Sequence, residues 1–227
     1  MQSEVVLPKH VPIAYSTRGN YVENVFYGSV AVVDRDGKLI AHVGDVDYPI
    51  FTRSALKPLQ ALPLVANPRF AEYGLTPAEI ALLCSSHNGE PVHAETAGRL
   101  LAKVGLTEAA LQCGSHTPYW YQWNNERPDP DKRWSPLFHN CSGKHSGFLT
   151  VTQHLKAGPE YVEIDHPLQK AVRAATEEVT GETVAGWGVD GCSATSASSS
   201  TGRSNVRCAS WSTPIASRMS MRTCSTK

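Results

Sequence analysis

A serine and a lysine that could act as a nucleophile and its base stand three residues apart, at Ser54 and Lys57. On a helix, residues at this spacing share a face, so the hydroxyl and the amine can meet. A serine hydroxyl attacks only when a base takes its proton, and a lysine becomes that base where burial or a nearby charge such as Arg53 lowers its pKa. The spacing therefore indicates a Ser/Lys pair, although Ser-x-x-Lys also arises by chance and serine is a common helix N-cap.

A proline predicts where the helix that carries this pair begins. Pro58 follows Lys57 directly, and a proline is tolerated in the first turn of a helix but costs about 3 kcal/mol further inside it. We therefore expect a helix that starts close to Ser54 and continues to Val65. Backbone N–H groups at such a start could hold the oxyanion of an acyl-transfer reaction.

Length, charge and cysteine content restrict the class of protein. The 227 residues are 41% hydrophobic, which is enough for a sizeable core, and 21 basic residues balance 21 acidic ones. This balance argues against nucleic-acid and membrane-surface binding and favours a small neutral or zwitterionic partner. Neither a signal peptide nor a run of eighteen apolar residues is present, which predicts a cytoplasmic protein. Six irregularly spaced cysteines favour reduced thiols or metal ligands over a disulfide framework.

The remaining patterns predict a mixed α/β (α+β) fold. An Asp-Gly pair between apolar runs at 28–33 and 39–43 is typical of a β-hairpin. Apolar periodicity and capping signals predict further helices, a loop that covers one face, and a strand. The helices are expected over 76–84, 93–104, 105–111, 148–155 and 166–181, the aromatic loop over 119–128, and the strand over 184–189. The polar loop at 85–91, between two helices, is a favoured place for chemistry.

The composition changes after Cys192. Residues 193–227 contain no Asp or Glu, are roughly half Ser and Thr, and show no helical or strand periodicity. We therefore expect one incomplete domain over 1–192 and a tail over 193–227 that is disordered or out of frame, with a natural low-complexity tail as the alternative.

Four segments, in this order, resemble the asparaginase II family of bacteria and fungi, which includes the rhizobial inducible, thermolabile asparaginase. They are 53–61 (RSALKPLQA), 85–91 (SSHNGEP), 140–145 (NCSGKH) and 188–192 (GVDGC). The resemblance implies hydrolysis of L-asparagine to L-aspartate and ammonia, on a fold similar to serine β-lactamases and glutaminases, which also use Ser-x-x-Lys. It covers about residues 10 to 192, and family members continue into a longer helical C-terminal portion. We therefore expect the fold to be incomplete at the C-terminus, with apolar helix surface exposed around Leu82, Leu101 and Phe148 and with weakened activity.

The resemblance also assigns roles to residues. Ser54 and Lys57 match one catalytic Ser/Lys pair, and Ser86 matches the serine of a second pair whose lysine would lie beyond Cys192, where no lysine occurs before Lys227. Arg53 and Asp190 match residues that line the active site.

A possible zinc site is implied as well, by the match of Cys141, Lys144 and Cys192 to two thiolates and a lysine amine that hold zinc in the family. Zinc accepts sulfur and nitrogen donors in a tetrahedral arrangement, and a lysine can bind it only as a neutral amine. Lysine is a rare ligand, so the residues alone favour a buried thiol beside a surface lysine over a metal site. His87 and His145 are further candidates for contact with the substrate or for a ligand or base role, although a hydrogen-bonded structural role is the commoner one for such a histidine.

These matches suggest a mechanism. Ser54 or Ser86 attacks the side-chain amide carbon of asparagine, Lys57 moves the proton, and Arg53 and Asp190 complement the α-carboxylate and α-amino groups of the substrate. A homodimer is possible. Two other classes remain open: another Ser-x-x-Lys hydrolase, although the β-lactamase signatures S-D-N and K-T-G are absent, and a non-catalytic zinc or amino-acid binding module.

Overall fold

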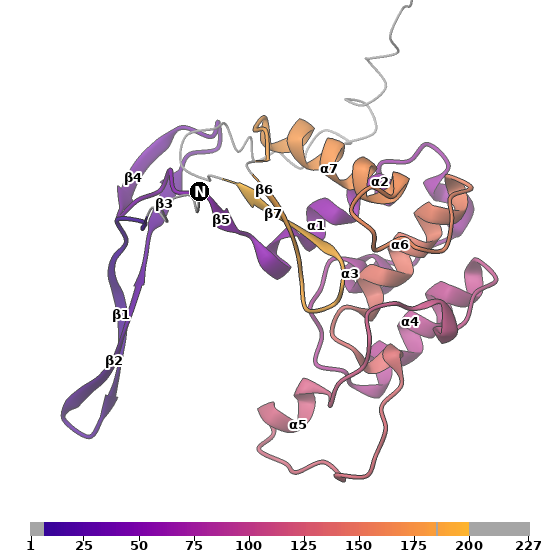
Figure 1. Ribbon diagram of the computed structural model, residues 1–227, viewed down its shortest axis with the longest axis horizontal. Helices are drawn as coiled ribbons and strands as arrows, with labels where there is room; N and C mark the ends of the chain where they lie inside the picture. Colours follow the sequence, from indigo (N-terminus) through magenta and orange to yellow (C-terminus); the bar gives the residue numbers. More distant parts are fainter. Residues whose placement is uncertain (1–6, 185, 200–227) are drawn as a thin grey trace, which may run out of the picture.

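The protein is described by a computed structural model that covers residues 7–184 and 186–199. Two β-hairpins form an arm that projects from a body of helices, and a small antiparallel sheet lies between the two (Figure 1). The arm contains β1 (Val11–Arg18) paired with β2 (Tyr21–Gly28), and β3 (Val30–Val33) paired with β4 (Leu39–Val43). The sheet has the order β5-β7-β6, formed by β5 (Ile50–Phe51), β7 (Thr195–Ser199) and β6 (Gly186–Val189).

The helices follow the order of the chain. The α-helices are α1 (Lys57–Gln60), α2 (Leu62–Val65), α3 (Pro77–Leu83), α4 (Pro91–Lys103), α5 (Tyr119–Trp123), α6 (Ser142–His154) and α7 (Pro167–Thr180). Short 3-10 turns lie at Arg53–Leu56, Phe70–Tyr73, Glu108–Ala110 and Pro136–Phe138. Within the described ranges, none of the helices combines the length and apolar character that crossing a bilayer requires. The predicted mixed α and β class is confirmed.

The Asp-Gly hairpin is confirmed, whereas the first hairpin was not predicted. Asp34 Oδ1 accepts hydrogen bonds from the backbone N–H groups of Asp36 and Lys38, both at 2.9 Å, and Gly37 takes the left-handed φ of +83° that this turn requires. The strand β2 carries apolar residues on both faces, with Val25 on one and Val22 and Phe26 on the other, so it lacks the period-2 signal on which a strand prediction depends.

The helical core contradicts the expectation of exposed apolar surface around three helices. Leu82, Leu101 and Phe148 are 5%, 0% and 2% exposed, because α3, α4 and α6 bury these side chains against one another. Gly143 permits the close approach of α6 to α3, since a Cβ there would lie 2.5 Å from the Leu82 carbonyl oxygen.

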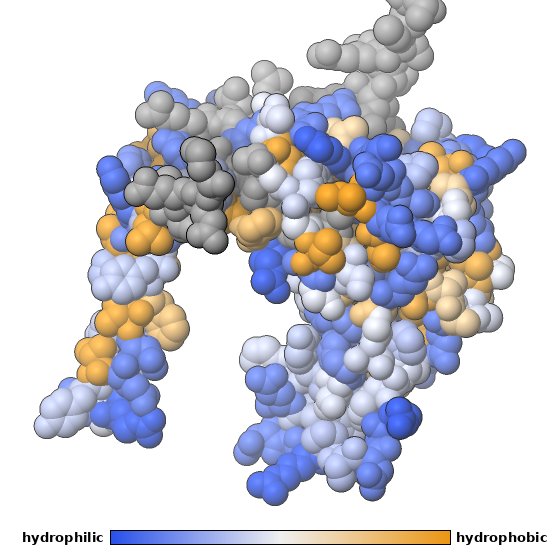
Figure 2. Space-filling view, in the orientation of Figure 1, coloured by the Kyte–Doolittle hydropathy of each residue, from blue (hydrophilic) through white to orange (hydrophobic). Residues whose placement is uncertain are grey.

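Large exposed hydrophobic and aromatic residues instead gather on the arm, where the valines, isoleucines and Phe26 give the orange patches in Figure 2. They are Ile13, Tyr15, Tyr21, Val22, Val25, Phe26, Tyr27, Val30, Val32, Ile40 and Val43.

Three local predictions differ from the structure. The expected continuous helix from Ser54 to Val65 is a 3-10 turn followed by two four-residue helices, because Pro58 and Pro63 each lack the N–H that an uninterrupted helix needs. The aromatic segment predicted as a loop contains α5. Residues 195–199, assigned to the tail, form β7, because strand pairing uses backbone groups and does not require an apolar pattern. Residues 200–227 of that predicted tail lie outside the described residues.

Glu79 caps the start of α3 and forms a buried ion pair. Its carboxylate accepts hydrogen bonds from the Thr76 backbone N–H at 2.7 Å and from Lys103 Nζ at 2.7 Å, and its side chain is only 3% exposed. Burial alone would raise the pKa of Glu79, but the hydrogen bonds from Lys103 and Thr76 outweigh burial and lower it. The charged carboxylate therefore stabilises the folded state.

We expect Glu79→Gln to lower the free energy of unfolding by about 1.5–3 kcal/mol near neutral pH, the usual value of a hydrogen bond to a charged group. A carboxyl group with a lowered pKa stabilises the fold above its unfolded-state pKa, and this contribution is lost as the pH falls through the lower folded-state value. The difference between the two proteins should therefore shrink in acid. Urea denaturation at several pH values measures it, with the exposed Glu72→Gln as a control that should change little. A constant difference down to the most acidic pH would contradict this role.

Candidate active site

The amine of Lys57 lies buried between two loops. The side chain starts from the first residue of α1, is 2% exposed, and donates hydrogen bonds to the backbone carbonyl oxygens of Ser85 at 2.8 Å and Asn140 at 3.3 Å. Burial lowers the pKa of Lys57. The charge of Cys141 and its hydrogen bond with the amine act in the opposite direction. A lysine with a lowered pKa is the kind that can serve as a general base.

Ser54 and Lys57 do not point toward one another as their spacing suggested. Ser54 is exposed on the 3-10 turn while Lys57 turns inward, and in the described part of the chain no hydrogen bond joins the two side chains. The reason is that a buried ammonium group must satisfy its hydrogens, and the two loop carbonyls do so. The N–H of Ala55 is also occupied, since it donates to the Thr52 carbonyl at 3.1 Å, so it does not provide the predicted oxyanion contact.

Ser86 lies on the polar loop that follows α3, as predicted, and its hydroxyl has a specific partner. The side-chain amide of Asn140 donates to Ser86 Oγ at 2.7 Å. The main chain joins the same two loops, because the His87 N–H donates to the Asn140 carbonyl at 3.2 Å. Lys57 also donates to this carbonyl. Ser86 and Lys57 are thus attached to one small network, although no direct hydrogen bond between them is described.

Arg53 and Asp190, predicted to lie in the site, form an ion pair with Arg53 Nε 3.2 Å from Asp190 Oδ1. Arg53 sits at the start of the 3-10 turn with a left-handed φ of +50°, and its side chain is 73% exposed. Asp190 lies in the turn between β6 and β7, where its N–H donates to the Ala194 carbonyl at 2.8 Å. This pair presents one positive and one negative group next to Ser54, an arrangement suited to a zwitterion.

Cys141, Lys144 and Cys192 come together from two parts of the chain. Cys141 is the N-cap of α6, Lys144 lies in its first turn, and Cys192 follows Asp190 in the β6–β7 turn. Lys144 Nζ donates to Cys192 Sγ at 3.2 Å, and the two buried thiols are hydrogen-bonded without forming a disulfide. The bond from Cys141 lowers the pKa of Cys192 and raises that of Cys141, so the pair favours one thiolate and one thiol.

The donor types of this cluster fit zinc. Two sulfur atoms and one amine nitrogen are ligands that zinc accepts in tetrahedral sites, with one position left open. Among the described residues no three His, Cys, Asp or Glu side chains form a metal-binding group, so the third donor would have to be Lys144. The Nε2 atom of His145 is buried near Cys192, and within the described ranges no atom lies in position to form a well-aligned hydrogen bond with it.

The two candidate histidines are buried and bonded to protein groups. His87 Nε2 lies 2.9 Å from Ser142 Oγ, its Nδ1 accepts from the Gly89 N–H at 3.1 Å, and burial lowers its pKa to about 3. His145 Nδ1 lies 2.8 Å from the Tyr161 hydroxyl, and burial lowers its pKa to about 4. Both rings therefore stay neutral. Contact of these histidines with the substrate stays a prediction, and their hydrogen bonds to protein groups favour a structural role instead.

Sequence reasoning missed the side chains of Asn140 and His116. Asn140 begins the segment 140–145 that carries the family resemblance, so a signal was present for it. His116 stands apart from every motif, and only the fold brings it within 3.1 Å of Asn140 Oδ1.

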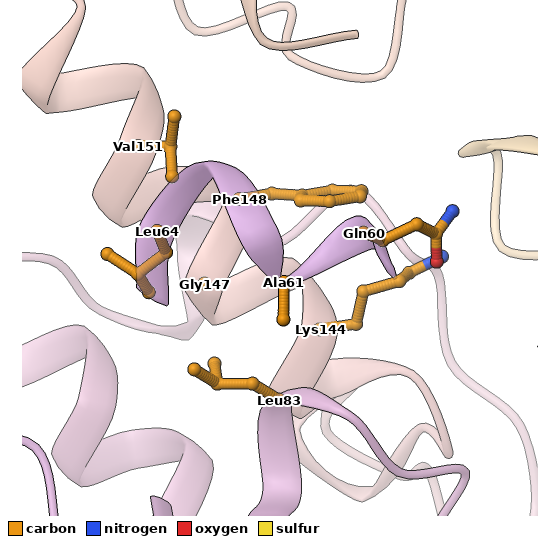
Figure 3. A pocket seen from close by; sticks show the side chains of 8 residues that line it. All are labelled: Gln60, Ala61, Leu64, Leu83, Lys144, Gly147, Phe148 and Val151. Carbon is orange, nitrogen blue, oxygen red and sulfur yellow. The ribbon is translucent and has the colours of Figure 1, made fainter. Parts of the chain in front are cut away.

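A small pocket adjoins the cluster but is poorly suited to an amino acid. It is lined by Gln60, Ala61, Leu64, Leu83, Lys144, Gly147, Phe148 and Val151. Most of these side chains are apolar, and Figure 3 shows the polar ends of Gln60 and Lys144 extending side by side at one edge of the pocket. An asparagine molecule, which carries two opposite charges, would lose its hydration there without gaining matched partners. The exposed Ser54 and Ser86 and the Arg53–Asp190 pair are therefore better candidates for contact with the substrate.

Gly89 fixes the loop that carries Ser86. It has a left-handed φ of +76°, and a Cβ would lie 2.6 Å from the Phe138 carbonyl oxygen and 2.7 Å from Pro118 Cβ. Gly105 has a similar φ of +69° but nothing within 4 Å of its Cβ position, which makes it a matched control.

We expect Gly105→Ala to cost about 1 kcal/mol for its backbone conformation alone. Gly89→Ala should cost about 1–3 kcal/mol more, because the added methyl group overlaps its neighbours. Chemical denaturation of the two variants measures the difference. Equal stabilities would show that the loop has room to move.

Comparison with protein families gives one match. The family model described as L-asparaginase II matches residues 14–211, which is most of the chain and extends beyond Cys192 into the predicted tail. A search among curated proteins finds no match.

Proposed function

Because this chain belongs to the L-asparaginase II family, and is thus an asparaginase-type amidohydrolase, we propose that it hydrolyses L-asparagine to L-aspartate and ammonia by a Ser/Lys mechanism. The observation that carries this proposal is the buried Lys57, which is held between the loop of Ser86 and the loop of Asn140. A buried amine with a lowered pKa, bonded to the loop that carries Ser86, is a suitable base for nucleophilic serine catalysis.

The reaction proceeds in two halves. A serine Oγ forms a bond to the side-chain amide carbon, while its proton passes to the neutral amine of Lys57, directly or through one water molecule. Lys57 returns the proton to the amide nitrogen, the C–N bond breaks, and ammonia leaves. Water then adds to the aspartyl ester, again giving a proton to Lys57, and aspartate departs as the serine regains its hydrogen.

Each candidate nucleophile has separate support. Ser86 is supported by its bond from Asn140 and by the attachment of its loop to Lys57. Ser54 is supported by its exposure and by its place next to Arg53, whose pairing with Asp190 provides charges for the substrate's α-carboxylate and α-amino groups.

We also propose that the protein binds a zinc ion. Cys141, Lys144 and Cys192 would hold it, and the ion would supply positive charge to the site while joining the start of α6 to the β6–β7 turn. The closeness of the three donors supports this assignment. A homodimer and a cytoplasmic location complete the proposal, and sedimentation of the purified protein tests the first of these.

Substitution of each serine separates the two nucleophiles. We expect the variant that lacks the nucleophile, either Ser54→Ala or Ser86→Ala, to lower kcat for asparagine by at least ~100-fold, because the covalent step is lost. Lys57→Met should have a comparable effect, because the base is removed. Ammonia release, with the exposed Lys170→Met as a control, measures these rates. Undiminished activity in both serine variants would reject the Ser/Lys mechanism.

Metal analysis tests the zinc site independently of activity. The protein purified with added zinc should contain about one zinc ion per chain, and Cys192→Ser should lose it because one of the two sulfur donors is gone. Cys84→Ser, which alters a half-buried thiol outside the cluster, should retain the metal. Zinc that persists in Cys192→Ser would place the ion elsewhere or show that it is bound without specificity.

A further inference from the structure

A chain of side chains leads from Ser86 away from Lys57, through Asn140 to His116. Asn140 Nδ2 lies 2.7 Å from Ser86 Oγ, and Asn140 Oδ1 lies 3.1 Å from His116 Nε2. The three residues come from three different loops, so this contact exists only in the folded protein. Neither side chain has been given a step in the mechanism described above.

The hydrogen bonds of His116 restrict the orientation of the Asn140 amide. His116 Nδ1 lies 2.6 Å from the Thr117 carbonyl oxygen, which only accepts, so Nδ1 carries a hydrogen. If Nε2 also carries one, it donates to Asn140 Oδ1, and the amide nitrogen faces Ser86. If Nε2 is unprotonated, it accepts from the Asn140 backbone N–H at 3.5 Å, and the amide reverses so that its NH₂ group also donates to Nε2 and its oxygen faces Ser86. In both cases His116 decides which end of the amide meets the serine.

The two orientations affect the Ser86 hydroxyl differently. When the amide nitrogen faces Ser86, it donates to Oγ, and the hydroxyl hydrogen remains available for a base. When the amide oxygen faces Ser86, it accepts that hydrogen, and a neutral amide is too weak a base to remove it. Only the first orientation, which is the one in the structure, leaves the serine ready for proton transfer.

The surroundings hold this chain in place. The Asn140 carbonyl accepts from Lys57 Nζ and from the His87 N–H, which fixes the backbone from which the amide extends. The His116 ring packs against His139 at 4.4 Å and against Tyr119 at 4.8 Å between ring centroids. The ring contacts and the hydrogen-bond donor of His116 are therefore separable by substitution.

We propose that Asn140 and His116 are positioning residues for Ser86: Asn140 orients the serine hydroxyl, and His116 sets the orientation of the Asn140 amide. This inference rests on the proposed function only in that it gives Ser86 a part in asparagine hydrolysis.

Two substitutions of His116 test the proposal. His116→Gln keeps an N–H donor for Asn140 Oδ1 and loses the ring, whereas His116→Phe keeps the ring contacts and loses the donor. We expect His116→Gln to retain kcat for asparagine within about threefold. His116→Phe and Asn140→Ala should lower kcat by ~10- to 100-fold with little change in KM, because a misplaced catalytic group slows the reaction without weakening binding. An active His116→Phe beside an impaired His116→Gln would show a packing role alone and overturn the proposal, as would equal kcat values in all proteins.

A second measurement does not depend on asparagine. A fluorophosphonate forms a bond between its phosphorus and a serine Oγ, fluoride leaves, and the hydroxyl proton passes to a base, so the rate of labelling reports the reactivity of the hydroxyl. Peptide mass spectrometry should find Ser86 labelled in the wild-type protein and in His116→Gln, and at least ~10-fold more slowly in His116→Phe. If the wild-type protein does not hydrolyse asparagine, the proposed function fails, and these rates alone decide the inference. Equal rates, or no labelling of Ser86, would contradict it.

Discussion

The burial of the Lys57 ammonium group is the constraint on which the candidate site depends. A charge taken out of water must find hydrogen-bond acceptors, and Lys57 finds them in the carbonyls of Ser85 and Asn140. These carbonyls belong to loops at the end of α3 and the start of α6, far apart in the sequence. By satisfying one lysine, the fold joins the loop that carries Ser86 to the loop that carries Asn140 and Cys141. The same burial lowers the pKa of Lys57, as a base requires.

Close packing beneath these loops fixes their positions relative to one another. Gly143 lets α6 approach the end of α3, and Gly89 lets the Ser86 loop pass against Phe138 and Pro118. The β6–β7 turn then brings Asp190 to Arg53 and Cys192 to Lys144. The polar groups of the site therefore occupy one region where α1, α6 and the small sheet meet, while the helices behind them supply the apolar core.

The sequence correctly predicted those elements whose start, end or turn is fixed by a few residues. Asp34 and Gly37 fix the hairpin between β3 and β4, Thr76 with Pro77 and Glu79 starts α3, and Gly181 in the left-handed conformation ends α7. The prediction was wrong where distant packing decides. Apolar surface on the helices around Leu82 was expected to be exposed, but these helices bury it against one another. The strand β7 has no apolar pattern in its sequence and forms by pairing with its neighbours β5 and β6.

The sequence by itself determined the family, the residue types of the site and the position of most helices, since these follow from motifs and from spacing along the chain. It could not determine which of those residues meet. Helical spacing paired Ser54 with Lys57, but the need to satisfy a buried charge turned Lys57 toward Ser85 and Asn140 instead. In the same way, only the tertiary structure placed His116 against Asn140, and Asn140 against Ser86, because hydrogen-bond partners on separate loops leave no periodic signal in the sequence.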